Sequence, residues 1–279
     1  MPPDLHECID CGNSFSGNYC NNCGEKRYTG HDKTVSHIVH EAVHFTTHLD
    51  SKYLKTLWLF ISKSGLVSKE FCEGRRKKYF KPVSMFLIAI VLYLLFPLLP
   101  GLNLKFGTHI ANNDTMGIQY SRSWAIQKIR KEKLTDIQFA EKFDHTSPKF
   151  AKVLLLLLLP LTALSLSLIF VKKKRYFFDH FILSAEINAS VVYLFFIILP
   201  LTAIVLSWIF RRNIPYGDHI IFSSAELILV LWVLTKGFMR FYEVKFAKAL
   251  ASSFLFILLF ALSVFIYRQL IFILVMLVI

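Results

Sequence analysis

The sequence predicts an all-α polytopic membrane protein of about five transmembrane helices, preceded by a small cysteine-rich ribbon. Three observations carry this prediction. Apolar residues make up 54% of the 279 residues, and phenylalanine alone contributes 27. Many of the apolar residues lie in runs long enough to cross about 30 Å of hydrocarbon. Two cysteine pairs lie before the first of these runs. A water-soluble globule is therefore excluded as the main body of the protein.

Five apolar segments approach the roughly twenty residues that a membrane crossing requires. They lie at 82–99, 153–171, 181–210, 220–235 and 249–279. We expect Pro160 and Pro200 to bend the second and third spans, because proline interrupts helical hydrogen bonding. The expected domains are a ribbon at 1–30, a juxtamembrane region at 31–81 and a transmembrane domain at 82–279, in which residues 101–152 form an extracytoplasmic segment.

The juxtamembrane region begins with a stretch of helical character. From Thr34 to Ser62 there is no proline or glycine, and apolar residues recur at helical spacing. This pattern predicts an amphipathic helix that lies on the membrane surface or on the transmembrane bundle.

Four cysteines near the N-terminus form two Cys-x-x-Cys pairs, each followed by glycine. They are Cys8, Cys11, Cys20 and Cys23. Two such pairs supply four thiolates for one tetrahedral zinc ion, so we expect one structural zinc. Disulfides would need an oxidising compartment, and no apolar export signal precedes Cys8, so we expect reduced thiols in the cytosol. A thioredoxin-like role is disfavoured because no strand–helix pattern surrounds either pair. Cys72 lies alone, and we expect no role for it.

The net charge of +13 arises from basic residues that gather beside the apolar runs. Such clusters lie at 75–78, 172–175 and 236–248, and five crossings would place all three on the cytoplasmic side. The clusters favour contact with anionic lipid headgroups over nucleic-acid binding, with Arg75, Arg76, Lys77 and Lys78 as the lipid-facing residues. Arg211 and the basic segment 101–152 oppose this orientation, although long loops follow the rule poorly.

Four histidines recur at intervals of three and four residues, which places them on one face of the predicted helix. They are His37, His40, His44 and His48. Within them, residues 40–44 match His-Glu-x-x-His, in which two histidines bind zinc and Glu41 activates its water. His40 and His48 are two turns apart, so they cannot share one ion, and a third ligand must come from elsewhere. A polar face in contact with solvent or headgroups is the favoured interpretation, and a second metal or haem site is the alternative.

Polar residues also recur where the third and fourth spans begin. Asp179, His180 and Glu186 lie in the first set, and Asp218, His219 and Glu226 in the second. The two sets resemble a weak inverted repeat of the kind found in transporters. Ionisable groups within a span are costly and are default functional candidates. Interfacial caps and buried hydrogen-bonding residues are the simpler interpretation.

The order of these motifs resembles the bacterial membrane-protein family catalogued as domain of unknown function 3667. The resemblance rests on the two-knuckle ribbon, the histidine-bearing helix ending at His48-Leu49-Asp50, Gly65, and the run from Gly74 to Tyr79. It extends to Asp179-His180 and Arg240-Phe241-Tyr242. Ser64 is a departure, because proline is expected before Gly65. The resemblance implies a fold and a bacterial inner membrane, but no activity.

These features favour a non-enzymatic recruitment or assembly protein that binds a protein partner through its cytosolic ribbon. One alternative is a membrane-associated zinc hydrolase with Glu41 as its base. Another is a small transporter, or a transporter subunit within an oligomer, that works through Glu186 and Glu226. Partner, substrate and oligomeric state are not defined by the sequence.

Overall fold

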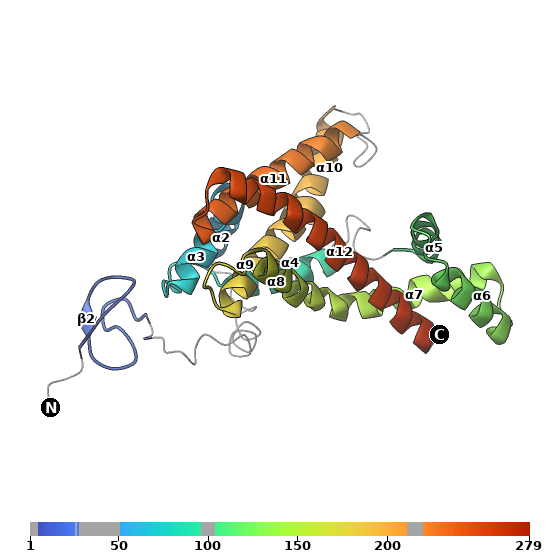
Figure 1. The fold of residues 1–279 in the computed structure, drawn as a ribbon, viewed down its shortest axis with the longest axis horizontal. Coiled ribbons are helices and arrows are strands. Elements are labelled where there is room, and N and C mark those ends of the chain that lie inside the picture. The colour runs from blue at the N-terminus through green and yellow to red at the C-terminus, as the bar shows by residue number, and fades with distance from the viewer. Residues whose placement is uncertain (1–4, 26, 28–50, 96–103, 211–219) are drawn as a thin grey trace. The chain divides into compact units, whose positions relative to one another are not determined.

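The computed structural model describes residues 5–25, 27, 51–95, 104–210 and 220–279. The chain forms two compact units, of which unit 1 comprises residues 1–98 and 159–259 and unit 2 comprises residues 99–158 and 260–279. The described residues are mostly helical (Figure 1), as the sequence predicts.

The N-terminal ribbon contains the two strands found among the described residues. Strand β1 (His6–Glu7) pairs antiparallel with β2 (Ser14–Phe15), and His6 lies opposite Phe15. Phe15 packs with Cys8 and Cys20 in a small core of its own. So few apolar side chains cannot stabilise a fold alone, and such modules depend on a metal or on contacts with a larger body.

The helices of unit 1 are arranged around α9. Their bounds are α2 (Ser51–Ser62), α3 (Leu66–Cys72), α4 (Pro82–Leu95), α8 (Leu158–Ile169), α9 (Phe177–Val191), η3 (Val192–Ile198), α10 (Leu199–Phe210), α11 (Ile220–Tyr242) and the first part of α12 (Phe246–Val278). Helices α2, α3 and α4 all contact α9, beside which they lie in Figure 1. The interior positions 178–189 of α9 are all buried, although the helix includes acidic, basic and amide side chains.

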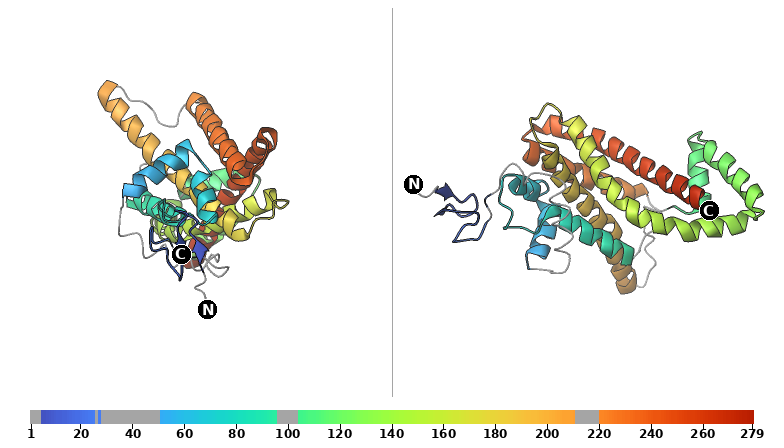
Figure 2. Two further views of the ribbon diagram at one scale, coloured as in Figure 1. Left: turned by 90° about the vertical axis from the view of Figure 1, so that its left-hand side faces the viewer. Right: turned by 90° about the horizontal axis from the view of Figure 1, so that it is seen from below.

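Unit 2 contains α5 (Phe106–Thr115), α6 (Tyr120–Glu132), α7 (Asp136–Leu154) and the C-terminal part of α12, which Figure 2 shows. Phe272 of α12 is stacked on His109 of α5, with ring centroids 4.6 Å apart. Asn113 and Gln269 exchange side-chain hydrogen bonds. Residues 104–152, most of the expected extracytoplasmic segment, form α5, α6 and all but the last two residues of α7.

Three helices in the described part of the chain are long and apolar enough to cross a membrane: Asp136–Ile169, Phe177–Ile209 and Phe246–Val278. The apolar helix α4 is shorter, and α11 covers the fourth expected span. The structure therefore supports a membrane protein with three spans by length and composition. The second of the expected spans belongs to a longer helix that begins at Asp136 rather than near residue 153.

The backbone changes its helical pitch just before two prolines. The 3₁₀ turn η2 (Leu155–Leu157) precedes Pro160, and the π-helical segment η3 precedes Pro200. Proline has no N–H, so the carbonyl four residues earlier loses its usual partner and the preceding turn tightens or widens. The interruptions lie where the sequence leads us to expect bends.

Gly65 connects α2 to α3 with φ of +78°, a conformation that L side chains rarely adopt. A Cβ atom at Gly65 would lie 2.6 Å from the carbonyl oxygen of Gly237 in α11. We predict that Gly65→Ala destabilises the detergent-solubilised protein by roughly 2–4 kcal/mol, through backbone strain and a backbone clash.

Gly117→Ala is the matched control for this prediction. Gly117 has φ of +73° but no atom within 4 Å of its added Cβ, so only the dihedral strain applies. Thermal unfolding followed by size-exclusion chromatography should show the larger loss for Gly65→Ala. Equal losses would mean that the contact with Gly237 contributes nothing.

Candidate functional site

The four ribbon cysteines converge on one point. One sulfur from each lies within 4.8 Å of the others. The Sγ atoms of Cys8 and Cys23 are 3.5 Å apart, and those of Cys11 and Cys20 are 3.6 Å apart. Four sulfurs about 2.3 Å from one tetrahedral ion would be about 3.8 Å apart, whereas a disulfide requires about 2.05 Å. The cysteine set thus fits a single metal ion and confirms that the sequence pairs form one cluster.

Each cysteine pair is shaped by a tight turn with a glycine at its end. The amide of Gly12 donates to the carbonyl of Cys8, and the amide of Gly24 to that of Cys20, both at 2.8 Å. Both glycines have positive φ, of +73° and +69°. Two equivalent turns therefore present two sulfurs each, and the glycines permit the backbone to close around the cluster.

The electrostatics of the thiols favour a bound cation. Backbone hydrogen bonding from Cys23 and Asn22 lowers the pKa of Cys20 to about 6 against the effect of its burial. For Cys23, a backbone hydrogen bond with Glu25 lowers the pKa, but burial and the three neighbouring thiols raise it to about 12. One thiolate forms readily, whereas the last is opposed by the others. A bound metal ion offsets this repulsion.

The ribbon contacts the turn that connects α3 to α4. The backbone amide of Lys77 donates to the Glu25 carboxylate at 3.0 Å, and its Nζ donates to the Cys23 carbonyl at 3.2 Å. Glu25 is buried, although it lies in a small surface module. Because Cys23 is a member of the metal cluster, Lys77 links the candidate metal centre to the helical body.

The other three basic residues of this turn also contact protein groups. Arg75 pairs with Glu73 at 2.7 Å, and Lys78 pairs with Glu70 at 2.9 Å. Arg76 is buried and lies over the Phe71 ring, 4.9 Å from its centroid. The predicted contact of these side chains with lipid stays a prediction, while the structure gives them intramolecular roles.

A second cluster surrounds the carboxylate of Glu186, which is fully buried within α9. Its Oε1 accepts from the amide of Gly65 at 2.6 Å, and its Oε2 accepts from the amide of Ser68 at 2.9 Å. The hydroxyl of Ser68 donates to Oε2 as well. The carboxylate therefore accepts hydrogen bonds from amides at the start of α3 that have no carbonyl partner within the helix. The helix dipole also favours a negative charge at this end.

The opposite side of the same turn contacts a cation. The guanidinium of Arg240 in α11 donates to the carbonyl of Ser64. The Ser64–Gly65 peptide thus has its carbonyl on Arg240 and its amide on Glu186. We call this arrangement the peptide clamp. It connects α9, α11 and the α2–α3 turn through two charges, and it supports a structural role for Glu186.

A third polar group lies at the N-terminal end of α9. Nδ1 of His180 is 2.7 Å from the hydroxyl of Tyr242, and Arg175 lies 3.9 Å from the Asp179 carboxylate. Cys72 is buried near them, and burial, assisted by the Asp179 charge, raises the pKa of its thiol well above the ordinary value. This thiol is therefore neutral and unreactive at physiological pH. Cys72 is a packed core residue with polar neighbours.

Beyond Glu186, the contact between α9 and the preceding helices continues into η3. Tyr193 donates from its hydroxyl to the Met85 carbonyl at 3.0 Å, so the hydroxyl of Tyr53, 2.7 Å away, must donate to Tyr193. Both tyrosines are buried. This chain of hydrogen bonds joins α2, η3 and α4.

Several sequence-predicted residues lie outside the part of the chain that the structure describes. They are His37, His40, Glu41, His44, His48, Asp218 and His219. Glu226 belongs to α11, but its side chain is not described. The histidine stripe and the second half of the inverted repeat therefore stay predictions.

The sequence alone does not indicate most of the groups around Glu186. Gly65 and Arg240 belong to the family resemblance, whereas no sequence pattern marks Ser68. Gly65 and Ser68 donate through backbone amides, which carry no residue-specific signal. The buried Glu186 itself was the available sign that donors had to exist.

Comparison with known protein families gives a match to part of the chain. Residues 50–94 match the family described as Protein of unknown function (DUF3667). The match confirms the family resemblance over α2, α3 and α4, which are the helices that contact α9. No curated protein and no solved structure gives a significant match to the chain.

We predict that the purified, tag-free protein holds one metal ion per chain in the ribbon, and that Cys20→Ser with Cys23→Ser removes it. Two of the four thiolates are then lost, and the remaining pair cannot complete a tetrahedral site. Elemental mass spectrometry measures the ratio of metal to protein.

Cys72→Ser is the control, because this cysteine lies outside the cluster and should leave the metal content unchanged. Retention of the metal after the double change at Cys20 and Cys23 would contradict the assignment. A second metal that disappears with His40→Ala and His44→Ala would establish a separate histidine site.

Proposed function

We propose that the protein is a membrane-anchored, non-enzymatic recruitment or assembly protein whose ribbon holds one structural zinc ion and binds a protein partner. Its anchor would have five spans in the bacterial cytoplasmic membrane, with the N-terminus in the cytosol. The observation that carries the proposal is the four-cysteine cluster in a small module that also contacts the helical body.

Zinc is the ion that this donor set favours. Four thiolates in tetrahedral arrangement are typical of structural zinc sites, and they leave no open coordination position for water or substrate. The cysteine site therefore supports stability of the ribbon rather than Lewis-acid catalysis. A closed site of this kind supports a binding module over a catalytic one.

The surface of the ribbon supports a role in binding protein. Leu5, Ile9 and Tyr19 are 65%, 62% and 62% exposed on a module of about thirty residues. Exposed apolar and aromatic side chains are the usual anchors of protein interfaces, and tyrosine is enriched among energetically dominant residues. Phe15 thus packs in the small core of the ribbon, whereas these three side chains lie on its surface and are available to a partner.

The contacts of the ribbon with the body support recruitment to a fixed position. Lys77 joins Cys23 and Glu25 to the α3–α4 turn, and Glu186 and Arg240 hold the other end of α3. A partner bound to the ribbon would therefore be held close to the membrane helices. Such placement distinguishes a recruitment platform from a freely tethered module.

The proposed orientation has support within unit 1. Lys173 donates to the Glu243 carbonyl at 3.2 Å, and Arg175 donates to the Phe241 carbonyl at 3.2 Å. Lys69 of α3 pairs with the Glu243 carboxylate at 2.6 Å. The α8–α9 and α11–α12 connections thus meet at one end of the unit beside α3. Basic residues on a shared end are expected to face the cytoplasm.

We predict that Leu5→Ser with Tyr19→Ser lowers recovery of the partner at least about tenfold, because apolar interface anchors contribute most of the binding energy. Zinc content and membrane insertion should stay unchanged, since both side chains point away from the core. Quantitative mass spectrometry of material purified from crosslinked membranes measures recovery.

Asn18→Ser changes an exposed polar residue of the same ribbon and serves as the matched control. Cys20→Ser with Cys23→Ser should also abolish recovery, through loss of the fold. An unchanged partner profile in both the surface variant and the cysteine variant would refute the recruitment role.

A further inference from the structure

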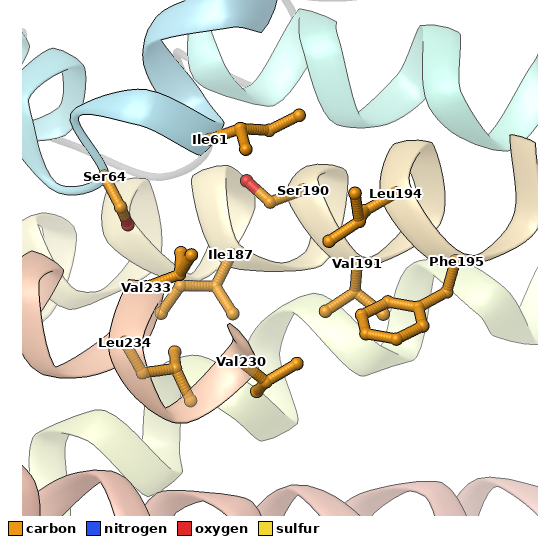
Figure 3. Close-up of a pocket in the computed structure, with 10 residues that line it drawn as sticks. All are labelled: Ile61, Ser64, Ile187, Ser190, Val191, Leu194, Phe195, Val230, Val233 and Leu234. Carbon is orange, nitrogen blue, oxygen red and sulfur yellow. The ribbon is translucent and has the colours of Figure 1, made fainter. Parts of the chain in front are cut away.

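Unit 1 contains an apolar pocket between α9, η3 and α11, with the end of α2 closing one side (Figure 3). Its volume is about 40 Å³. The lining consists of eight apolar side chains and two serines: Ile61, Ser64, Ile187, Ser190, Val191, Leu194, Phe195, Val230, Val233 and Leu234. Ser190 donates its hydroxyl to the carbonyl of Glu186, so that part of the wall offers little polarity.

The peptide clamp holds the walls of this pocket together at one end. Ser64 lines the pocket and accepts from Arg240, and the next residue, Gly65, lies against Gly237 of α11. Farther along, the π-helical segment η3 supplies Leu194 and Phe195. The pocket is therefore formed by elements with fixed contacts, and it lies within helices that the sequence assigns to membrane spans.

A cation lies one helical turn beyond the pocket residue Val233 on α11, beside an exposed tryptophan. The Lys236 ammonium lies 4.5 Å from the centroid of the Trp232 ring, and Trp232 is 57% exposed. Lys236 is three residues after Val233, so their side chains are neighbours on the helix surface. Tryptophan and lysine together are typical of the level of lipid headgroups, whereas the valines and leucines before them suit acyl chains.

We propose that this pocket holds a segment of one acyl chain of an anionic phospholipid whose phosphate contacts Lys236. The basic residues of α11 are Lys236 and Arg240, and Arg240 is held by the peptide clamp. The ammonium of Lys236 is therefore the cation available to a lipid headgroup, and its charge favours an anionic one. The volume admits a few methylene groups, so the rest of the chain continues along α11 past Val230 to the exposed Leu227. The lipid would join α11 to α9 where the two helices leave a gap.

The site differs from the basic turn at residues 75–78, whose side chains contact protein groups. It requires both an apolar recess and a cation one helical turn away. Bulk lipid contacts every exposed membrane face equally, whereas this site should retain one lipid after the bulk lipid is removed. A transmembrane helix of another protein is the competing occupant, and it would leave no retained lipid.

Native mass spectrometry of the full-length, detergent-purified protein provides the test. The protein is incubated with an equimolar mixture of phosphatidylglycerol and phosphatidylcholine that share the same acyl chains. We expect one retained lipid, with at least fivefold preference for phosphatidylglycerol. Lys236→Gln should remove this preference, and Val233→Trp, which fills the pocket, should lower retention of both lipids at least fivefold.

Leu258→Trp is the matched control, because Leu258 is 67% exposed on α12 and lies outside the pocket. A second measurement needs no substitution. Phosphatidylglycerol with a photoreactive acyl chain should label the peptides that contain Leu194 and Val233 in preference to exposed α12. Even labelling of all apolar faces, or retention unchanged by Val233→Trp, would overturn the proposal.

Discussion

The fold of unit 1 depends on one fully buried carboxyl group, that of Glu186. Moving an ionised carboxylate from water into the protein interior costs several kcal/mol unless hydrogen bonds replace those to water. Gly65 and Ser68 supply these hydrogen bonds, and Arg240 places a positive charge across the same peptide. The need to satisfy this carboxylate fixes where α3 begins and how closely α11 approaches.

The segment that matches the family contains the residues that bind the Glu186 carboxylate. Residues 50–94 form α2, α3 and α4, and all three helices contact α9, a helix that lies outside the matched region. Tyr53, Ser68 and Met85 provide one polar contact from each of these helices to α9 or η3. The three matched helices thus pack against α9, and the turn between α3 and α4 contacts the ribbon.

Local features of the structure were predictable from the sequence, and long-range ones were not. The cysteine cluster followed from residue spacing, because all four ligands lie within sixteen residues. The apolar helices followed from composition, and within the described residues three of the five expected spans are supported by length and hydropathy. Prolines marked the irregular turns before Pro160 and Pro200.

The partners of Glu186 lie about 120 residues away, and two are backbone amides, so no sequence pattern indicates them. The run at 75–78 has the composition of a lipid-binding cluster, but Glu70, Glu73 and the Cys23 carbonyl lie within reach of its side chains. Charge alone predicts a basic surface. Only the fold shows which charges contact protein.

Hydrogen exchange at the amides of Gly65 and Ser68 tests the role of Glu186 most directly. In Glu186→Gln, one carboxylate oxygen becomes an NH₂ group that faces donors, so we predict at least about tenfold faster exchange across residues 64–72. Glu243→Gln, which alters an exposed pair with Lys69, should leave exchange of these two amides unchanged. Equal protection in wild type and Glu186→Gln would contradict the claim that this carboxylate holds α3 in place.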